Sequence, residues 1–339
     1  MTSPIILAVD GGNSKTDLAL VDVEGHVLAF VRGPLSSPHH LGLAGCLDVL
    51  QRLFYDASEQ AGLDRRNGPV AELGVLRMAG VDFPSEEDAL HAVVSERRWA
   101  NRVSVGNDTF AVLRAGTERG WGVAVVCGTG INCVGVAPDG RHVRFPALGE
   151  ITGDWGGGYD VGIAAVSAAA RSEDGRGPRT SLEHSVPAYF GLSSPLELAE
   201  AIHNKKIPRR RVIELPRLVF ADAADDAVAA AIVARLADEV VALARAALTR
   251  LDLTQQPVEV VLGGGLLQTV DGPVVGKIAD GLAEVGPYIT VRPAASAPVV
   301  GAALLGLDEL DATPEAQDRL RRELTQTDTT PTMRTGADG

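Results

Sequence analysis

The sequence predicts an α/β fold in which one unit of strands and helices occurs twice. Both copies begin with the same order of signals: an apolar strand, a tight glycine turn, a second strand, a turn containing Asp and Gly, and a third strand. Apolar residues make up 45% of the 339-residue chain, and few of them are aromatic. That composition suits helices packed closely on sheets.

The first copy opens with Ile5–Val9, a continuous apolar run typical of a buried strand. The turn at Gly11-Gly12 leads to a second strand, Asp17–Val21, and the turn Asp22–Gly25 leads to a third, Val27–Val31. The elements expected after them are helix Gly45–Ala61, strand Leu73–Met78, helix Ser85–Val94, strand Val103–Val105 and helix Phe110–Ala115.

The second copy repeats this plan with the strands Val123–Val126, Asn132–Val136 and His142–Phe145. Its turns are Gly128–Gly130 and Pro138–Gly140. The elements expected after them are helices Ile163–Ala170 and Leu196–Ala201, a long amphipathic helix within Asp222–Leu251, strand Val258–Leu262, helix Val274–Ala283, strand Tyr288–Val291 and helix Pro298–Leu307.

This repetition indicates duplication of a whole unit rather than a short solenoid repeat. We expect an N-terminal domain over residues 1–117 and a C-terminal domain over residues 118–310, with the final helices free to pack back on the first. A hinge is expected near Gly116–Gly120. Residues 311–339 are expected to form a polar, partly disordered tail, in which Pro314–Leu324 predicts one more helix.

The charge and cysteine content limit the partners and the compartment. A formal net charge of −13 disfavours nucleic acid, which normally meets a basic patch, and the basic run Arg209–Arg211 is expected to be solvated. We find no secretion signal and no uncharged apolar run of ~18 residues, so no membrane partner is expected. Three scattered cysteines argue against a disulfide framework. We therefore expect a cytoplasmic protein.

The first glycine turn lies in the stretch VDGGNSKTD, which does not match the Walker pattern because its glycines are adjacent. Glycines still let a backbone approach phosphate and expose successive N–H groups. Two such turns at equivalent points of a duplicated unit favour a phosphate site over two ordinary hairpins. The expected phosphate-binding residues are Gly11, Gly12, Asn13, Ser14, Lys15, Thr16, Gly128, Thr129 and Gly130.

Two aspartates follow predicted strands. Asp10 ends a buried strand, where a carboxylate must be paired or bind a cation, unless it makes a cap or loop hydrogen bond. Asp108 comes between strand Val103–Val105 and helix Phe110–Ala115. It could face a cleft at the carboxyl end of the strand or cap the helix, and the residues alone favour the cap.

Four motifs occur in a fixed order: VDGGNSKTD, VGNDTFAVLRAG, CGTGINC and ITGDWGGGYDVG. With the duplicated unit, they make residues 5–307 resemble the BadF/BadG/BcrA/BcrD family, which includes N-acetylglucosamine kinases and belongs to the actin-like ATPase superfamily. The resemblance implies a duplicated ribonuclease H-like fold whose two domains flank a cleft for ATP and Mg²⁺. It also implies transfer of the γ-phosphoryl group of ATP to a hexose or aminosugar, with the 6-hydroxyl of N-acetylglucosamine or glucosamine as the expected acceptor.

The same resemblance assigns roles to residues of this chain. Asp108 would be the general base that accepts the proton of the attacking sugar hydroxyl, and Asn107 would orient it and belong to the substrate-binding residues. Asp10 would orient Mg²⁺ through water. The adenosine would lie on the triple glycine formed by Gly263, Gly264 and Gly265.

The residues expected to contact the sugar are less uniform. Asn132 and Asp154 resemble residues that hydrogen-bond the sugar, although an Asx-turn is an alternative for Asp154. Trp155, beside Asp154, could stack on the sugar or belong to the core. The segment GPLSSPHHLG departs from the family, because Pro38 stands near the position of an Asn that contacts the sugar. We expect Ser37 or His39 to replace that Asn, and the identity of the sugar stays open.

Two rival functions remain on the same fold. The chain could be an ATPase that activates a partner enzyme, as the dehydratase activators of this family do. Their iron–sulfur cluster needs a pair of cysteines; Cys127 has a suitable place, but no cysteine follows Cys133. The chain could instead be a sugar sensor, which loss of the base would favour, yet Asp108 is present. A small sugar is the expected partner, and a homodimer is left open.

Overall fold

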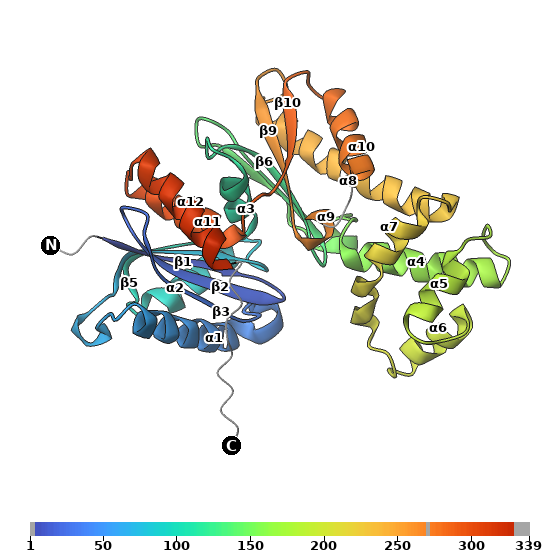
Figure 1. The fold of residues 1–339 in the computed structure, drawn as a ribbon, viewed down its shortest axis with the longest axis horizontal. Coiled ribbons are helices and arrows are strands. Elements are labelled where there is room, and N and C mark those ends of the chain that lie inside the picture. The colour runs from blue at the N-terminus through green and yellow to red at the C-terminus, as the bar shows by residue number, and fades with distance from the viewer. Residues whose placement is uncertain (1–3, 269–271, 329–339) are drawn as a thin grey trace. The chain divides into compact units, whose positions relative to one another are not determined.

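The structure is a computed structural model, and it describes residues 4–268 and 272–328. The chain forms two compact units (Figure 1). The first consists of the residues up to Gly120 together with those from Ala295 onward, and the second of Trp121–Ala294. The boundary at Gly120 lies three residues beyond the one expected at 117. Residues 295–310 were expected in the second domain, with the final helices free to pack back on the first, and they belong to the first unit.

The first unit is built on a five-stranded sheet with the order β3-β2-β1-β4-β5. Its first three strands are antiparallel hairpins, and β4 and β5 run parallel to β1. The helices that accompany this sheet are α1, α2, α3, α11 and α12. The strands are β1 (Ile5–Gly11), β2 (Lys15–Asp22), β3 (Val27–Pro34), β4 (Ala71–Met78) and β5 (Ala100–Asn107).

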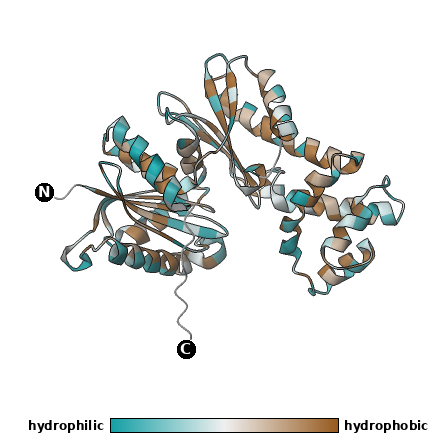
Figure 2. Ribbon diagram, in the orientation of Figure 1, coloured by the Kyte–Doolittle hydropathy of each residue, from teal (hydrophilic) through white to brown (hydrophobic). Residues whose placement is uncertain are grey.

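Each face of this sheet buries its own apolar cluster. Residues such as Leu7 and Leu18 pack against α1 (Pro38–Gln60), whereas Ile6 and Ala8 pack against α11 (Pro298–Glu309). Strand periodicity explains the division, since successive side chains of β1 point to opposite faces. Figure 2 shows mostly hydrophobic residues along these strands. The remaining helices are α2 (Pro84–Ser95), α3 (Thr109–Gly116) and α12 (Pro314–Asp328).

Helix α11 approaches α3 very closely. A Cβ added at Gly301 of α11 would lie 1.8 Å from the carbonyl oxygen of Ala111 in α3. Only glycine permits such an approach between two helix backbones. This packing, together with the contacts of α11 on β1 and β4, explains why α11 belongs to the first unit although it follows the second along the chain.

The second unit repeats the topology around a sheet with the order β10-β9-β6-β7-β8. Strands β6, β7 and β8 are antiparallel neighbours, and β9 and β10 run parallel to β6. The duplicated plan is therefore present in both units. The strands are β6 (Gly122–Cys127), β7 (Ile131–Val136), β8 (His142–Arg144), β9 (Val258–Gly263) and β10 (Ile289–Pro293).

A helical insertion separates the hairpins of the second unit from its long helix. Helix α8 (Ala227–Arg250) packs on β6 and β7, as α1 does on the first sheet. Its start is capped by Asp226, whose carboxylate accepts hydrogen bonds from Val228 and Ala229 at 2.8 Å. The other helices are α4 (Gly158–Glu173), α5 (Leu182–Tyr189), α6 (Pro195–His203), α7 (Pro216–Asp222), α9 (Gly265–Gln268) and α10 (Gly272–Ala283).

Several elements differ from the sequence expectations. Helix α1 begins at Pro38 rather than near Gly45, with proline at its first position and a kink at Gly42. Helix α5, which contains Pro187, was not expected. Helix α12 continues to Asp328 through residues expected to be disordered, and residues 329–339 of that expected tail lie outside the described residues. In the described part of the chain, no helix is both long and apolar enough to cross a membrane.

Candidate active site

The first glycine turn, between β1 and β2, needs its glycines for packing. A Cβ added at Gly11 would come within 2.3 Å of the side chain of Met78 and 2.8 Å of the hydroxyl of Ser36. A Cβ at Gly12 would lie 2.9 Å from the carbonyl oxygen of Lys15, which accepts the Gly12 amide at 2.9 Å. Asn13, Ser14 and Lys15 are exposed at the tip. The turn is thus a tight hairpin that offers exposed polar groups.

Thr16 has a different place from its neighbours. It is fully buried, and its hydroxyl is hydrogen-bonded to the carbonyl oxygen of Pro34 and to the hydroxyl of Ser36, both at 2.7 Å. The amide of Ser36 also donates to the carbonyl oxygen of Gly12 at 3.3 Å. Thr16 therefore fastens the segment that follows β3 against the turn.

That segment carries the expected sugar contacts Ser37 and His39. Ser37 precedes α1 and is fully buried, and its hydroxyl has no hydrogen-bond partner in the described part of the chain. Such a buried orphan hydroxyl is uncommon and costs stability. His39 is exposed in the first turn of α1, and its Cβ would lie 3.1 Å from a Cβ added at Gly80.

Asp10 lies near the end of β1 and is only 8% exposed. Burial raises the pKa of Asp10 to about 8, and the charges of Asp108 and Asp17 add to the rise while Lys15 and Arg32 oppose it. A buried carboxylate with two acidic neighbours favours a proton or a cation. The Asp10 carboxylate offers oxygen ligands of the kind that Mg²⁺ prefers. In the described residues, no three acidic, His or Cys side chains cluster as a metal site.

Asn107 and Asp108 divide the work at the start of α3. Asp108 makes no side-chain hydrogen bond that caps the helix. The side chain of Asn107 does so instead, because its Oδ1 accepts the Thr109 amide at 3.0 Å and the Thr109 hydroxyl at 2.5 Å. Its Nδ2 donates to the carboxylate of Asp82 at 2.7 Å. The prediction that the Asp108 side chain caps this helix is thus wrong.

The carboxylate of Asp108 is held in a low-polarity place. Burial, with a contribution from the Asp82 charge, raises the pKa of Asp108 to about 6, and the backbone amides of Thr109 and Asp108 itself offset part of that rise. A carboxylate that titrates near pH 6 is ionised at neutral pH and is a better proton acceptor than an ordinary aspartate. The charge of Asp108 also contributes to the raised pKa of Asp10.

The second glycine turn, between β6 and β7, is exposed and open. A Cβ added at Gly128 or Gly130 would meet no protein atom within 4 Å, and neither residue has a positive φ. Packing within the protein therefore does not require glycine at Gly128 or Gly130. Close approach of a ligand to the backbone would require it. The turn is fixed from behind by α4, whose Gly158 and Tyr159 amides donate to the carbonyl oxygens of Gly128 and Thr129 at 2.9 and 3.0 Å.

Two further expected residues follow this turn. Asn132 is half-buried in β7, and its Oδ1 accepts the Cys133 amide at 2.7 Å. Asp154 lies in the loop before α4, and its carboxylate accepts the hydroxyl of Thr152. The amide of Gly156, which an Asx-turn at Asp154 would use, donates to Asp160 at 3.1 Å instead.

The triple glycine ends β9 and begins α9. Gly264 has a φ of 87°, and a Cβ there would lie 2.3 Å from the carbonyl oxygen of Cys127 at the end of β6. Gly265 is different, because a Cβ added there meets nothing within 4 Å. Gly264 is needed by the fold, and Gly265 leaves an open backbone surface.

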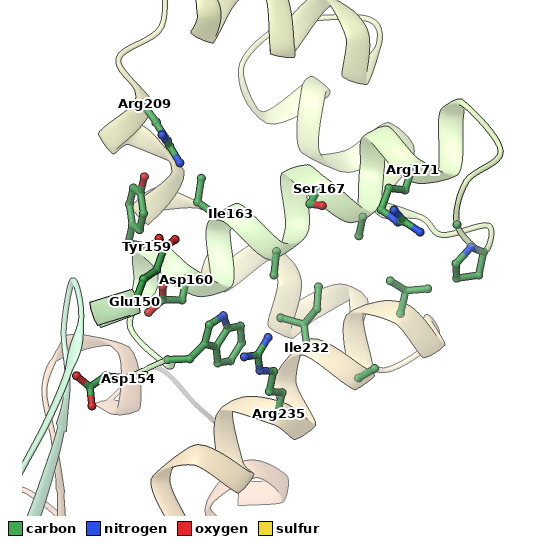
Figure 3. Close-up of a pocket in the computed structure, with 17 residues that line it drawn as sticks. Glu150, Asp154, Tyr159, Asp160, Ile163, Ser167, Arg171, Arg209, Ile232 and Arg235 are labelled. Atoms are coloured by element: carbon green, nitrogen blue, oxygen red, sulfur yellow. The ribbon is translucent and has the colours of Figure 1, made fainter. Parts of the chain in front are cut away.

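Asp154 also lies at one end of a pocket of about 550 Å³ between α4 and α8 (Figure 3). Arg171 lies at the opposite end, and Ile163, Ser167 and Ile232 line the middle. The guanidinium of Arg235 lies 4.1 Å from the centre of the Trp155 ring. One face of that indole is thus occupied by a cation, and Trp155 also packs on the core of the unit.

A second, smaller pocket of about 280 Å³ lies among α7, α8 and α10. Its walls are apolar, and Lys277 stands at its rim, where its Nζ lies 3.3 Å from the carboxylate of Asp238. Helix α10 is the next helix after the triple glycine and α9. The pocket walls include Phe220, Ala223, Ala224, Ala230, Val233, Ala234, Ala237, Pro273 and Val274.

The predicted residues thus fall into two groups, one in each unit. The first unit holds Asp10, Lys15, Ser37 and Asp108 with their neighbours. The second holds the turn Gly128–Gly130, Asn132, Asp154 and the triple glycine. Sequence reasoning missed Asp17, which pairs with Lys15, and Arg32, which pairs with Asp17. The available signal was a charged residue inside an apolar strand.

Known proteins resemble this chain over most of its length. It is 28% identical to an N-acetylmuramic acid/N-acetylglucosamine kinase of Clostridium acetobutylicum, over 78% of this chain and 86% of that protein. It is 25% identical to an N-acetyl-D-glucosamine kinase of Dictyostelium discoideum, over 91% of this chain and 99% of that protein.

Solved structures share the fold. A protein of Chromobacterium violaceum, provisionally classed as an N-acetylglucosamine kinase, superposes with a TM-score of 0.71 at 25% identity, covering 89% of this chain and 99% of that one. A ROK hexokinase of Thermus thermophilus has a TM-score of 0.54 at 20% identity, covering 91% and 99%. The second likeness shows only that this chain shares its fold with a hexokinase. The model of the BadF/BadG/BcrA/BcrD ATPase family matches residues 7–306, and the chain belongs to this family.

Proposed function

We propose that this protein is an ATP-dependent kinase that phosphorylates the 6-hydroxyl of N-acetylglucosamine or a closely related aminosugar. The observation that carries the proposal is the carboxylate of Asp108. It begins α3 without capping it, and its pKa is raised to about 6. The names of the Clostridium and Dictyostelium relatives support a sugar kinase.

Asp108 would act as the general base. Its carboxylate accepts the proton of the sugar hydroxyl as the oxygen forms a bond to the γ-phosphorus, and the bond from that phosphorus to the bridging oxygen breaks to release ADP. Asn107 keeps the start of α3 fixed through Thr109, so the helix does not depend on the Asp108 carboxylate for its cap. The transition state is loose, so positioning matters more than a strong base.

The ATP would be held by residues of both glycine turns. Exposed side chains and remaining backbone amides at Gly11–Lys15 and at Gly128–Gly130 would donate to phosphate oxygens. The amides of Gly12 and Gly128 are excepted, because they donate within their own turns. Adenosine would lie on the open backbone at Gly265, with the base in the apolar pocket among α7, α8 and α10. Mg²⁺, when bound through water to Asp10, would offset the charge of the phosphates.

Asn132, Asp154, Ser37 and His39 would recognise the sugar. The carboxylate of Asp154 and the exposed ring of His39 offer hydrogen bonds to a sugar hydroxyl or an N-acyl group. The Ser37 hydroxyl, which is fully buried and has no partner in the described part of the chain, would have to be uncovered first. A site that must satisfy such groups rejects analogues lacking them. Trp155 is better explained as a core residue that Arg235 covers.

The test is turnover with a panel of sugars. Purified protein with ATP and Mg²⁺ is given N-acetylglucosamine, glucosamine, N-acetylmuramic acid and glucose, and both ADP and sugar phosphate are measured. The proposal predicts equal amounts of the two products, with N-acetylglucosamine or N-acetylmuramic acid turned over fastest. ADP release that no sugar stimulates would contradict it.

The rival functions have less support in the residues. Burial raises the pKa of the Cys127 and Cys133 thiols, as expected of packing residues rather than of exposed cluster ligands. A sensor would not need a carboxylate with the environment of Asp108.

A further inference from the structure

Asp17 stands at the centre of a row of charged residues across three strands. It lies directly opposite Asp10 of β1 and opposite Arg32 of β3. Paired residues of adjacent strands point to the same face of a sheet, so the three side chains are neighbours. Two carboxylates directly opposite each other would repel, and the row needs compensating cations.

Asp17 receives two cations. Nε and Nη2 of Arg32 donate to its two carboxylate oxygens at 2.6 and 2.9 Å, and Nζ of Lys15 donates at 2.8 Å. The Asp17 side chain is completely buried, whereas those of Lys15 and Arg32 are 45% and 38% exposed. The buried carboxylate of Asp17 is therefore flanked by two exposed cations.

Arg32 alone satisfies a carboxylate, because its planar guanidinium makes the bidentate pair. Lys15 is the additional partner. A free lysine head moves among many rotamers, and holding it costs conformational entropy. Here the head is fixed at the first residue of β2, directly after the glycine turn.

We propose that Asp17, itself held by Arg32, is a positioning residue that fixes the Lys15 ammonium at the first glycine turn to receive the phosphates of ATP. This inference rests on the proposed nucleotide-dependent function and assigns a role to two residues outside the turn. Asp17 does not touch the nucleotide, since it is buried; it acts through Lys15.

The test compares Asp17→Asn, Lys15→Met and the double variant. Each single variant is expected to lower kcat/KM for ATP at least tenfold while the KM for the sugar stays within twofold. Because Asp17 acts through Lys15, the double variant is expected to lose no more than Lys15→Met. Losses that multiply, or a Lys15→Met variant with unchanged kcat/KM for ATP, would overturn the proposal.

The controls separate positioning from folding. Asp22→Asn makes the same chemical change on the same strand, at a residue paired with His26, and should leave activity and melting temperature unchanged. If Asp17→Asn fails to fold, Lys15→Met still tests the proposal, because the buried Asp17–Arg32 pair stays intact. Lys15→Arg should restore part of the loss, since it returns the charge.

Calorimetric titration with Mg-ADP tests the positioning role of Asp17 separately from the proposed sugar kinase activity. A wild-type protein that binds Mg-ADP but phosphorylates no sugar would contradict the proposed function alone. The positioning role would still predict at least tenfold weaker Mg-ADP binding by Asp17→Asn and Lys15→Met. Equal binding by wild type and both variants would overturn it.

Discussion

Asn107 caps helix α3 by accepting the Thr109 amide at 3.0 Å, and this leaves the carboxylate of Asp108, between them, without a capping role. Asn107 and Asp108 are adjacent and similar in shape, but they have different roles. One holds the helix, and the other presents a half-buried carboxylate. The two can be separated by measurement, because one substitution should affect stability and the other should not.

Asn107→Ala is expected to lower the free energy of unfolding by about 1–2 kcal/mol, the usual cost of a lost helix cap. The change also removes the donor to Asp82. Asp108→Asn should leave stability at pH 8 equal or higher, because it removes a negative charge that the folded state disfavours, as the raised pKa of Asp108 indicates. Urea denaturation of both variants checks this. Equal losses in both would show that Asp108 also supports the helix.

Asp10 should make the stability of the Mg²⁺-free protein depend on pH. The pKa of Asp10 is raised to about 8, whereas an unfolded aspartate titrates near pH 4, so the folded state holds a proton that the unfolded chain releases between those values. The free energy of unfolding should therefore fall as pH rises from about 4 to about 8. Asp10→Asn should flatten this component.

The measurement for Asp10 is thermal unfolding at pH 5.5 and pH 8, with and without Mg²⁺. Mg²⁺ binds the ionised carboxylate, so its stabilisation of the wild type should be larger at pH 8. Asp22→Asn serves as control and should keep the wild-type slope. An identical slope in Asp10→Asn and wild type would show that Asp10 does not titrate in this window.

The triple glycine offers a matched pair of substitutions. Gly264→Ala should cost at least about 2 kcal/mol, because an L-residue there takes a left-handed backbone and meets the Cys127 carbonyl oxygen at 2.3 Å. Gly265→Ala meets no protein atom within 4 Å and should fold normally. If adenosine lies on Gly265, this variant should instead raise the KM for ATP. Melting curves give the stability of the two variants, and steady-state kinetics give the KM for ATP. An unchanged KM in Gly265→Ala would contradict the placement of adenosine on Gly265.

Helix α12 should stabilise the end of α3. The guanidinium of Arg321 donates to the carbonyl oxygens of Ala115 and Thr117 at 2.7 and 2.8 Å, where a helix carries partial negative charge. Arg321→Met is expected to cost about 1–3 kcal/mol, the range for hydrogen bonds to a charged group. The exposed neighbour Arg322 gives the control, since Arg322→Met should change stability by less than about 0.5 kcal/mol. Equal effects in urea denaturation would assign no special role to Arg321.

The strands and the duplicated plan could be predicted because they depend on local pattern. Ile5–Val9 and Val123–Val126 are apolar runs followed by glycines, and both are strands. The start of α1 was missed because Ser37-Pro38 resembles a loop, although Pro38 suits the first position of a helix. The placement of α11 could not be derived from pattern, since it depends on the long-range contact between Gly301 and Ala111.

The candidate site also has residues that local sequence pattern predicts and residues whose roles depend on long-range contacts. Asp10 and the glycine turns could be singled out because they interrupt or end apolar strands. The sequence could not predict that Asn107 caps the helix while Asp108 leaves its carboxylate free of that role, because Asn and Asp cap helices equally well. The role of Asp17 depends on the register that sets it opposite Asp10 and Arg32, which a single strand does not reveal.

The role of Asp108 in phosphoryl transfer is tested most directly by the pH dependence of kcat/KM for N-acetylglucosamine in wild type and Asp108→Asn. Because kcat/KM reports ionisations of the free enzyme, it should fall with decreasing pH below about 6, where Asp108 takes up a proton. Asp108→Asn should lose at least about 100-fold at pH 8 and show no such fall. Wild-type activity that is unchanged between pH 5 and 8, or an Asp108→Asn variant within threefold of wild type, would contradict the assignment of Asp108 as the base.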